Sequence, residues 1–467
     1  MHASLLSSCA LAAALFTAAC TVPARREAWP EPRPLGGEYP VFRPPEEAPS
    51  SPGPPSRPDE PEGEITLEQA LGLALLGNPG LAAFSWEVRA AEARALQAGL
   101  LPNPSLDVEL EEFGGTRERS GLGGAETSVR VGQMFLTAGK RKKRTRVADL
   151  GRTVAALEWE TKRLDVVAET MRAFTGVLAA QEQVALAEEA VRLSEKMLRA
   201  VSERVQAGKV SPLEESKARV ALASVRIAGL RARRDLEVAR RRLAAAWGGT
   251  EPRFTRAKGA FEKVIDPPPL EKLLEELSRN PRVARRRAEV ERRRAAVELE
   301  EARAVPDPTL SAGVRHYADG DSNAFILGLS VPMPFFDRNQ GGVAEARHGL
   351  AGALAELDAE TVAVRLAMEK AYRNVNAACM EVRALEKEVL PAAEAAFSAA
   401  REGYLQGKFG YIDLLDAQRT LVRARSQYIQ ALAAYHAARS DLERLAGKPI
   451  GAWTTEETYP PVKEEYP

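Results

Sequence analysis

The stretch PNPSLDVELE, residues 102–111, decides the fold of this chain. Beyond its second proline, apolar residues alternate with acidic ones: Leu106, Val108 and Leu110 against Asp107, Glu109 and Glu111. Alternation with a period of two predicts a β-strand that has one apolar face and one acidic face. Such a strand needs an apolar environment on one side and water on the other.

A second strand follows closely. Residues 126–135, ETSVRVGQMF, set Val129 and Val131 against Ser128 and Arg130, and the Gly-rich residues 114–124 separate this segment from the first strand. The pattern predicts a β-hairpin. Each strand is about ten residues long, which is the length that a tilted strand needs to cross a bilayer.

The whole plan occurs twice in the chain. NPGLA at Asn78 matches NPRVA at Asn280, PNPSL matches PDPTL, which ends at Leu310, and residues 208–248 match 407–447 at a constant offset of 199. The second copy repeats the alternation at Leu310, Ala312 and Val314 and again at Phe325, Leu327, Leu329 and Val331. We therefore expect two copies of one unit, at residues 64–260 and 265–450.

Long helices should follow each pair of strands. Between Leu350 and Val389, apolar residues recur in steps of four and three, which is typical of coiled-coil packing. In the first unit no proline interrupts residues 140–208, so the helix there should reach about 100 Å. In the second unit Pro391 should bend the corresponding helix.

Four strands cannot stand alone in a membrane, because the two edge strands would leave backbone groups unpaired in hydrocarbon. Two chains would give eight strands, whose interior side chains nearly fill the barrel, whereas three chains would give twelve strands and an aqueous lumen. We therefore predict a trimer that combines a 12-stranded membrane β-barrel with a long α-helical coiled-coil barrel. The polar face should line the lumen, through Asp107, Glu109, Glu111, Ser128 and Arg130.

The two ends of the chain lie outside these units. Residues 1–19 form a short apolar run that ends in small residues, which is typical of a secretory signal. The run resembles a bacterial lipoprotein signal, and this resemblance implies that Cys20 is acylated; cleavage near Ala19 would instead leave Cys20 a free thiol. Residues 20–63 are rich in proline and should form an extended tether, and residues 451–467 form a C-terminal tail.

Composition excludes several classes of function. Lys and Arg number 65, as do Asp and Glu, so the formal net charge of zero argues against bulk attraction to nucleic acid. The four histidines are scattered, Cys379 stands alone in a helical pattern, and no catalytic or metal-binding motif occurs. We expect no enzyme activity, no cofactor and no metal site.

Basic residues form one dense run, GKRKKRTR, at residues 139–146. Nucleic-acid binding is one reading of such a run, but it lacks interleaved aromatic residues and follows a membrane strand. We expect these side chains to lie near phospholipid headgroups. Three triple arginines, which begin at Arg240, Arg285 and Arg292, lie in segments that also carry glutamates and should form ion pairs.

Several motifs together resemble the TolC-like outer-membrane efflux proteins. They are LLPNPSLDVEL (100–110), AGKR (138–141), SVPMPFFDRNQG (330–341) and YIDLLDAQRTL (411–421), and the resemblance spans roughly residues 65–447. AGKR and FFDRNQG are most similar to the heavy-metal branch. The resemblance implies a trimeric conduit in the outer membrane of a Gram-negative bacterium that crosses the periplasm and docks on a periplasmic adaptor and an inner-membrane pump, of RND type.

Two turns, GKVSP at Gly208-Lys209 and GKFGY at Gly407-Lys408, should end long helices, with glycine in the left-handed conformation. As exposed tips, the two turns are candidates for adaptor contact. Asp413 and Asp416 follow the second turn on one helix face, where carboxylates also suit a solvated helix start. In the resembled family an Asp pair in this context narrows the periplasmic entrance, which implies a cation-favouring gate here.

The leading hypothesis is a passive exit duct of a tripartite efflux system for small solutes, heavy-metal cations in particular. The same architecture could serve organic drugs or type I protein secretion. A hypothesis of another class is a periplasmic coiled-coil adaptor. An adaptor would have one helical hairpin and would be soluble without its lipid anchor, whereas this chain should have two hairpins and need detergent.

Overall fold

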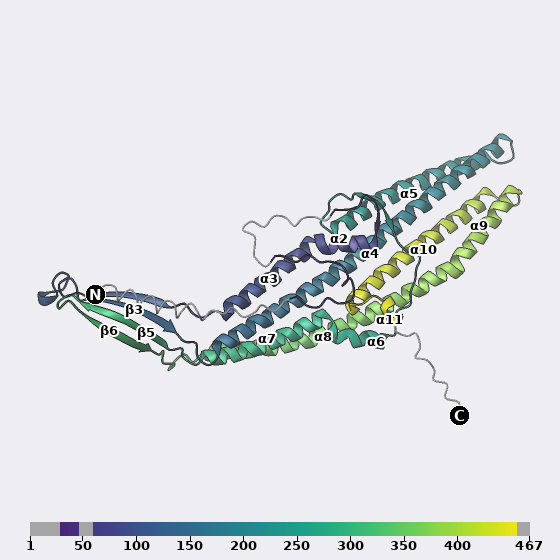
Figure 1. The fold of residues 1–467 in the computed structure, drawn as a ribbon. Helices are drawn as coiled ribbons and strands as arrows, with labels where there is room; N and C mark the ends of the chain where they lie inside the picture. Colours follow the sequence, from purple (N-terminus) through teal and green to yellow (C-terminus); the bar gives the residue numbers. More distant parts are fainter. Residues whose placement is uncertain (1–28, 46–58, 455–467) are drawn as a thin grey trace, which may run out of the picture.

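The structure, a computed structural model, describes residues 29–45 and 59–454. Figure 1 shows an elongated molecule with a β-sheet at one end and the tips of two helical hairpins at the other. The elements of the first unit are β1 (Gly63–Thr66), α2 (Leu67–Gly77), α3 (Pro79–Gly99), β2 (Ser105–Glu111), η1 (Arg117–Arg119), β3 (Glu126–Met134), α4 (Lys140–Gln206) and α5 (Pro212–Ala245). Those that follow are β4 (Phe254–Lys258), α6 (Leu270–Glu275), η2 (Glu276–Arg279), α7 (Pro281–Arg303), β5 (Thr309–Tyr317), β6 (Ser322–Ser330), α8 (Gln340–Ala384), η3 (Leu385–Val389), α9 (Leu390–Leu405), α10 (Tyr411–Ala446) and α11 (Gly451–Thr454).

The predicted duplication is confirmed. Each unit contributes one β-hairpin, and the two hairpins join into a four-stranded antiparallel sheet in the order β2-β3-β5-β6. In this sheet Leu106 lies opposite Val131, Val131 opposite Ala312, and Ala312 opposite Leu327. The register therefore keeps the apolar positions of all four strands on one face.

The two long helical hairpins differ in the predicted way. Helix α4 runs through 67 residues without interruption, about 100 Å at 1.5 Å per residue. In the second hairpin, α8 ends in the π-helical segment η3, and Pro391 lies in the first turn of the following helix α9. Because proline has no N–H to bond to the preceding turn and its ring crowds that turn, the α-helical ladder is interrupted and bends there.

The a/d stripe of α8 is buried as predicted over its central part. Its buried members are Val364, Met368, Ala371, Val375, Ala378, Val382 and Leu385. All of them except Val364 pack in one core with α4, α10 and the β4 strand, which includes Phe174, Phe254 and Tyr435. Toward the two ends of the stripe, Leu354 and Val389 are 40% and 41% exposed.

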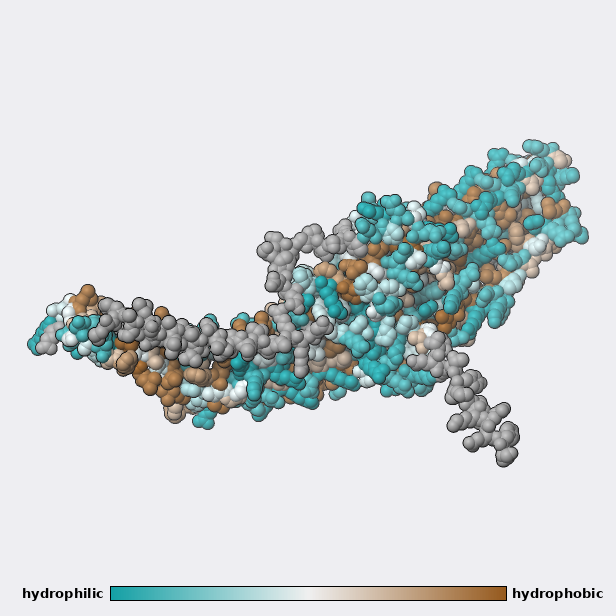
Figure 2. Space-filling model, in the orientation of Figure 1, coloured by the Kyte–Doolittle hydropathy of each residue, from teal (hydrophilic) through white to brown (hydrophobic). Residues whose placement is uncertain are grey.

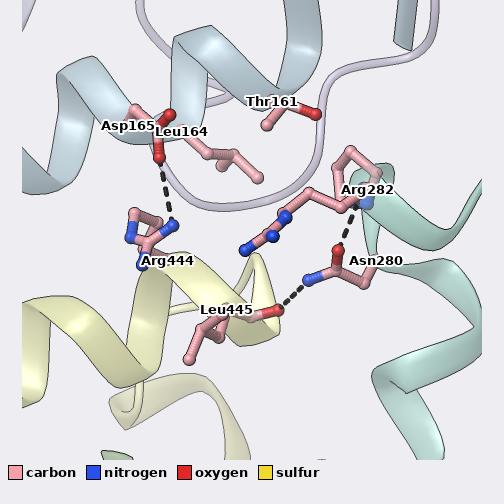
Figure 3. A pocket seen from close by; sticks show the side chains of 8 residues that line it. Thr161, Leu164, Asp165, Asn280, Arg282, Arg444 and Leu445 are labelled. Atoms are coloured by element: carbon pink, nitrogen blue, oxygen red, sulfur yellow. Dashed lines mark hydrogen bonds and ion pairs between the residues drawn. The ribbon is translucent and has the colours of Figure 1, made fainter. Parts of the chain in front are cut away.

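Both units fasten the end of a long helix with an asparagine. Asn78 caps α3 and Asn280 caps α7, each through its side-chain oxygen. The same side chains also donate from Nδ2 to a backbone carbonyl at the end of another helix. Asn78 donates to Ala246 O at the end of α5, and Asn280 donates to Leu445 O at the end of α10, both at 2.8 Å. Figure 3 shows the second of these contacts beside the Arg444–Asp165 ion pair. The cavity there is about 10 Å³, room for about one water, so its role is structural.

The sequence patterns did not predict the parallel pair of β1 and β4. Ile65 lies opposite Ala257, so the start of the first unit pairs with the connection between the units. Ile65 of β1 and Phe254 of β4 are fully buried. A five-residue strand that pairs across almost 200 residues leaves little local signal in the sequence.

Within the predicted extended tether, residues 29–45, which we call the N-terminal arm, pack against the helices. Leu35 is buried at 4% exposure, and the rings of Trp29 and Trp159 meet edge to face with centroids 5.0 Å apart. The buried Arg163 donates to Leu35 O (2.9 Å) and to Arg33 O (3.0 Å). Apolar residues among the prolines therefore dock the arm on α4.

The N-terminal arm also contacts the second unit, at η2 and at the end of α10. Arg33 Nη2 donates to Glu276 Oε2 (3.0 Å) and to Ala446 O (2.7 Å), and Lys448 binds Glu276 at 2.7 Å. Burial disfavours the charged Glu276 carboxylate, but the hydrogen bonds from Lys448 and Arg33 outweigh that effect and lower its pKa. The arm thus ties α4, η2 and the end of α10 together. The signal, Cys20, the prolines at 46–58 and the tail at 455–467 lie outside the described residues.

Candidate functional site

The sheet separates charge from hydrophobic surface. The five residues proposed for the lumen, Asp107, Glu109, Glu111, Ser128 and Arg130, all lie on one face, because each acidic residue of β2 is opposite a polar residue of β3. Arg130 forms an ion pair with Glu109 across the strand pair. The structure therefore brings the predicted set together on a polar face.

Arg315 on β5 belongs to the same face and was not among the predicted residues. Its guanidinium binds Glu111 at 3.0 Å and Glu126 at 2.7 Å, and it donates to Ser128 Oγ at 2.9 Å. These contacts join the two hairpins across the β3–β5 pair. The signal was present in the sequence, since Arg315 follows Val314 in an alternating strand.

The opposite face of the sheet is apolar and exposed. Its most exposed members are Leu106 (68%), Val108 (67%), Phe325 (94%), Leu327 (78%) and Leu329 (70%). Figure 2 shows hydrophobic surface over the sheet. A soluble monomer rarely leaves so continuous an apolar surface in water, so this face needs an apolar environment.

The basic run at residues 139–146 joins the sheet to the helices. Lys140 binds Asp307 at 2.8 Å, Arg141 donates to Gly99 O at 2.7 Å, and Arg144 donates to Ala98 O at 2.7 Å. These carbonyls end helix α3, where cations match the unpaired C=O groups and the helix dipole. Part of the run is therefore engaged within the chain, which its spacing alone did not indicate. The triple arginines form ion pairs as predicted, for example Arg286 with Glu356 at 2.5 Å.

The two Gly-Lys turns lie at the end of the molecule farthest from the sheet (Figure 1). Gly208 and Gly407 have φ of 69° and 76°, the left-handed conformation that glycine adopts without strain. Lys209 N donates to Arg204 O (2.9 Å), and Lys408 N donates to Gly403 O (2.8 Å), which closes each helix end in the same way. The four tip residues are exposed in both copies.

Asp413 and Asp416 are exposed on the first two turns of α10. Asp413 Oδ2 accepts a hydrogen bond from Gly410 N at 3.0 Å, so this carboxylate also caps the helix. On the other side of the helix, Tyr411 and Leu414 are buried against α4 residues such as Val201. The helix is therefore held by its apolar side while its acidic side stays open.

The guanidinium of Arg204 links the two helical hairpins close to their tips. Arg204 of α4 donates to Tyr404 O of α9 at 2.7 Å, and its guanidinium lies 4.6 Å from the centre of the Tyr404 ring. Burial raises the pKa of Tyr404, so the phenol stays neutral beside the cation. The sequence did not identify this contact, since its partners are 200 residues apart.

Groups that could carry chemistry are used in packing. Burial lowers the pKa of His436, whose Nε2 donates to Phe261 O at 2.7 Å, and burial raises the pKa of the Cys379 thiol. Within residues 29–45 and 59–454, no group of three or more His, Cys, Asp or Glu side chains is placed to hold a metal ion. None of the helices in that part of the chain is both long and apolar enough to span a membrane.

Comparison with known sequences gives consistent findings. The family described as outer membrane efflux protein matches residues 70–249 and 273–448, most of the chain. The cobalt-zinc-cadmium resistance protein CzcC of Cupriavidus metallidurans is 35% identical over 391 residues, 84% of this chain and 92% of that protein. The nickel and cobalt resistance protein CnrC of the same organism is 30% identical over 312 residues, 66% of this chain and 72% of that protein.

Comparison with solved structures agrees in fold. The crystal structure of CusC, described with its transmembrane channel formation, aligns with a TM-score of 0.71 at 16% identity and covers 87% of this chain and 99% of that one. At this level of identity the likeness concerns the fold alone. It confirms the predicted combination of paired strands with long helical hairpins.

Proposed function

Since the chain belongs to the outer membrane efflux protein family, we propose that it is the exit duct of a tripartite pump that exports heavy-metal cations through the outer membrane. The observation that carries this proposal is the sheet, with an exposed apolar face on one side and ion-paired charges on the other. Two helical hairpins extend from the sheet and end in paired tips (Figure 1). This arrangement suits a passage through lipid that continues into an aqueous compartment.

Three chains would complete the duct. β2 and β6 are edge strands in the single chain, and their backbone groups need partners in a membrane. The outer side of α5 carries exposed apolar residues at helical spacing: Leu213, Val220, Ile227, Leu230 and Val238. Exposed Val362, Leu366 and Met380 lie on α8. These stripes support contacts between neighbouring chains along the helical barrel.

The lumen would be acidic overall. Asp107, Glu109, Glu111 and Glu126 share the polar face with Arg130 and Arg315, so carboxylates outnumber guanidinium groups on this face in each chain. Rings of carboxylates favour cations over anions. Among the described residues of the single chain, no group of three or more His, Cys, Asp or Glu side chains is placed to hold a metal ion.

The tip of the second helical hairpin, present once in each of three chains, would form the entrance. Asp413 and Asp416 of three chains would narrow the periplasmic mouth, and Gly208, Lys209, Gly407 and Lys408 would contact the adaptor of an RND-type pump. An acyl chain on Cys20 would add a lipid anchor. The basic side chains of residues 139–146 other than Lys140, Arg141 and Arg144 would face lipid headgroups.

The cargo rests on the relatives that are named for resistance to cobalt, zinc, cadmium and nickel. Complementation tests it. In a Gram-negative strain whose heavy-metal pump lacks its outer-membrane component, expression of this chain should restore growth in Zn²⁺, Co²⁺ or Cd²⁺. Restored export of organic dyes by a drug pump, without metal resistance, would contradict the metal cargo and leave the duct itself intact.

A further inference from the structure

We propose that β6 of one chain pairs with β2 of the next chain in one defined register. This register places Leu329 opposite Val108 of the neighbouring chain and Gly328 opposite Glu109 of the neighbouring chain. The inference rests on the proposed trimeric duct and specifies the contact that closes it. It follows from the internal duplication and needs no observed neighbour.

The first step assigns equivalent positions in the two hairpins. The motifs PNPSL and PDPTL make Leu106 of β2 equivalent to Leu310 of β5. Leu106 lies opposite Val131, and Leu310 lies opposite Leu329. Val131 of β3 is therefore equivalent to Leu329 of β6.

The second step uses the contact between the two units as a template. Within the chain, β3 of the first unit pairs with β5 of the second, and Val131 lies opposite Ala312. Ala312 is equivalent to Val108, because each lies two residues beyond its equivalent leucine. If every unit meets the next in the same way around the barrel, Leu329 meets Val108 of the neighbour. The next pair, Arg130 and Gly313, likewise gives Gly328 and Glu109.

The chemistry of the two edges fits this register. On the apolar face it joins Leu329 to Val108, side chains that are 70% and 67% exposed in the single chain. On the polar face it joins Glu109 to a glycine. A shift by one residue would bring the acidic side chains of β2 to the apolar face, which lipid would penalise strongly.

A glycine opposite a large polar side chain is already used inside the chain. A Cβ added at Gly313 would lie 2.2 Å from the backbone O of Val129 and 2.7 Å from Cγ of Arg130, so the close approach of β3 and β5 at this position requires glycine. Between chains the roles are exchanged, because the large residue is on β2 and the glycine on β6. Each contact between units thus pairs one bulky polar residue with one glycine.

The register also gives a reasonable barrel. Leu106 lies opposite Val131 and Val131 opposite Ala312, which is two residues beyond the equivalent of Leu106. If each of the six units in a trimer adds the same two-residue stagger, the strands tilt by roughly 35° from the barrel axis, within the range of closed barrels.

Engineered disulfides test the register in the full chain in outer membranes. In a Cys379→Ala background, we would compare two matched pairs, Val108→Cys with Leu329→Cys and Glu109→Cys with Gly328→Cys. Since directly opposed pairs alternate between closer and wider spacing, at least one of the two should have suitable geometry. The controls are each single cysteine and two slipped pairs, Val108→Cys with Leu327→Cys and Val108→Cys with Val331→Cys.

After mild oxidation, non-reducing electrophoresis should show covalent dimers and trimers for a matched pair at about five times the yield of either slipped pair. Higher yield from a slipped pair would overturn the register. Absence of cross-links from all pairs would also overturn it if light scattering of the purified particle gives three chains. A particle of one chain in light scattering would overturn the proposed duct together with its closing contact.

Discussion

The two units share a plan but differ in how they are held. In the first unit, α4 is continuous and α5 packs mainly along α4, and α5 carries exposed apolar residues. In the second unit, Pro391 interrupts the helix, and α10 packs against α4, α8 and α9. The same duplicated hairpin is therefore continuous in one copy, and in the other it is interrupted and its second helix packs against three helices.

The two Gly-Lys turns differ in the charges of the residues that follow them. Position 214 is Glu and position 217 is Lys in the first unit, and the equivalent positions of the second unit are Asp413 and Asp416. Mixed charges suit contact with a neighbouring helix, whereas paired carboxylates suit a surface that faces passing cations. We infer from this difference that the second turn encloses the entrance and that the first supports it from outside.

The largest expected effect concerns Glu276, where the N-terminal arm binds the second unit; Glu60, which precedes β1, makes the comparable contact at the end of the first unit. Glu276→Gln removes the charge that Arg33 and Lys448 share, and it should lower the free energy of unfolding by about 2–3 kcal/mol. Glu60→Gln, at the corresponding clamp on Trp247 and Phe254 N, should cost about 1 kcal/mol, because its donors are neutral. Denaturant titration of the detergent-purified protein measures both.

The clamp should also depend on pH. The pKa of Glu276 is lower in the folded chain than its ordinary value of 4.5, so the unfolded chain binds the proton first. The stability that Glu276 adds is complete above pH 4.5 and declines as the pH falls through the folded pKa. The difference between wild type and Glu276→Gln should shrink over that range, and a constant difference from pH 7 to pH 3 would contradict this origin.

The next effect concerns the entrance. Replacement of Asp413 and Asp416 by alanine should raise single-channel conductance in planar bilayers by several-fold and weaken cation preference, because a ring of carboxylates would be lost. The matched control is Glu214→Ala with Lys217→Ala at the equivalent turn, which should leave conductance unchanged. Equal changes in both double variants would remove the distinction between the two turns.

A smaller difference is expected at the two asparagine clamps. Asn280 is 3% exposed and Asn78 is half-buried, so Asn280→Ala should cost about 2 kcal/mol and Asn78→Ala about 1 kcal/mol in unfolding free energy. Asn280→Asp keeps the cap but loses the Nδ2 donor to Leu445 O. If the aspartate variant is as stable as wild type, the clamp contributes nothing.

The smallest effect is local. Pro391→Ala restores an N–H to the bent helix, and amides in Leu385–Val389 should exchange hydrogen roughly tenfold more slowly as an α-helical ladder re-forms. Pro212→Ala is the matched control, because a proline in the first turn of α5 blocks no helical bond. Faster exchange in Pro391→Ala would show that the proline does not cause the π-helical segment.

The features of this fold that could be predicted are those that depend on local sequence patterns. Alternation marked β2, steps of four and three marked α8, and Gly208 and Gly407 marked the tips. Each of these depends on neighbours within a few residues, and the duplication doubled the signal.

The features that sequence reasoning missed depend on distant partners. Arg33 looked like one residue of a proline-rich tether until the structure placed it against Glu276, 243 residues away. Arg204 and Tyr404 likewise meet only because the two hairpins pack together. The sequence proposed Asp413 and Asp416 for the entrance and pointed to a helix start there, but it did not show that Gly410 N donates to Asp413 Oδ2.

One measurement tests most directly which turn encloses the entrance. Spin labels at Ala207→Cys and, separately, at the equivalent Gln406→Cys, both exposed at the tips, would report distances between the copies of each tip in a Cys379→Ala background. We expect distinctly shorter distances between labels at 406 than between labels at 207. Equal distances, or shorter distances at 207, would contradict the assignment of the second turn to the entrance.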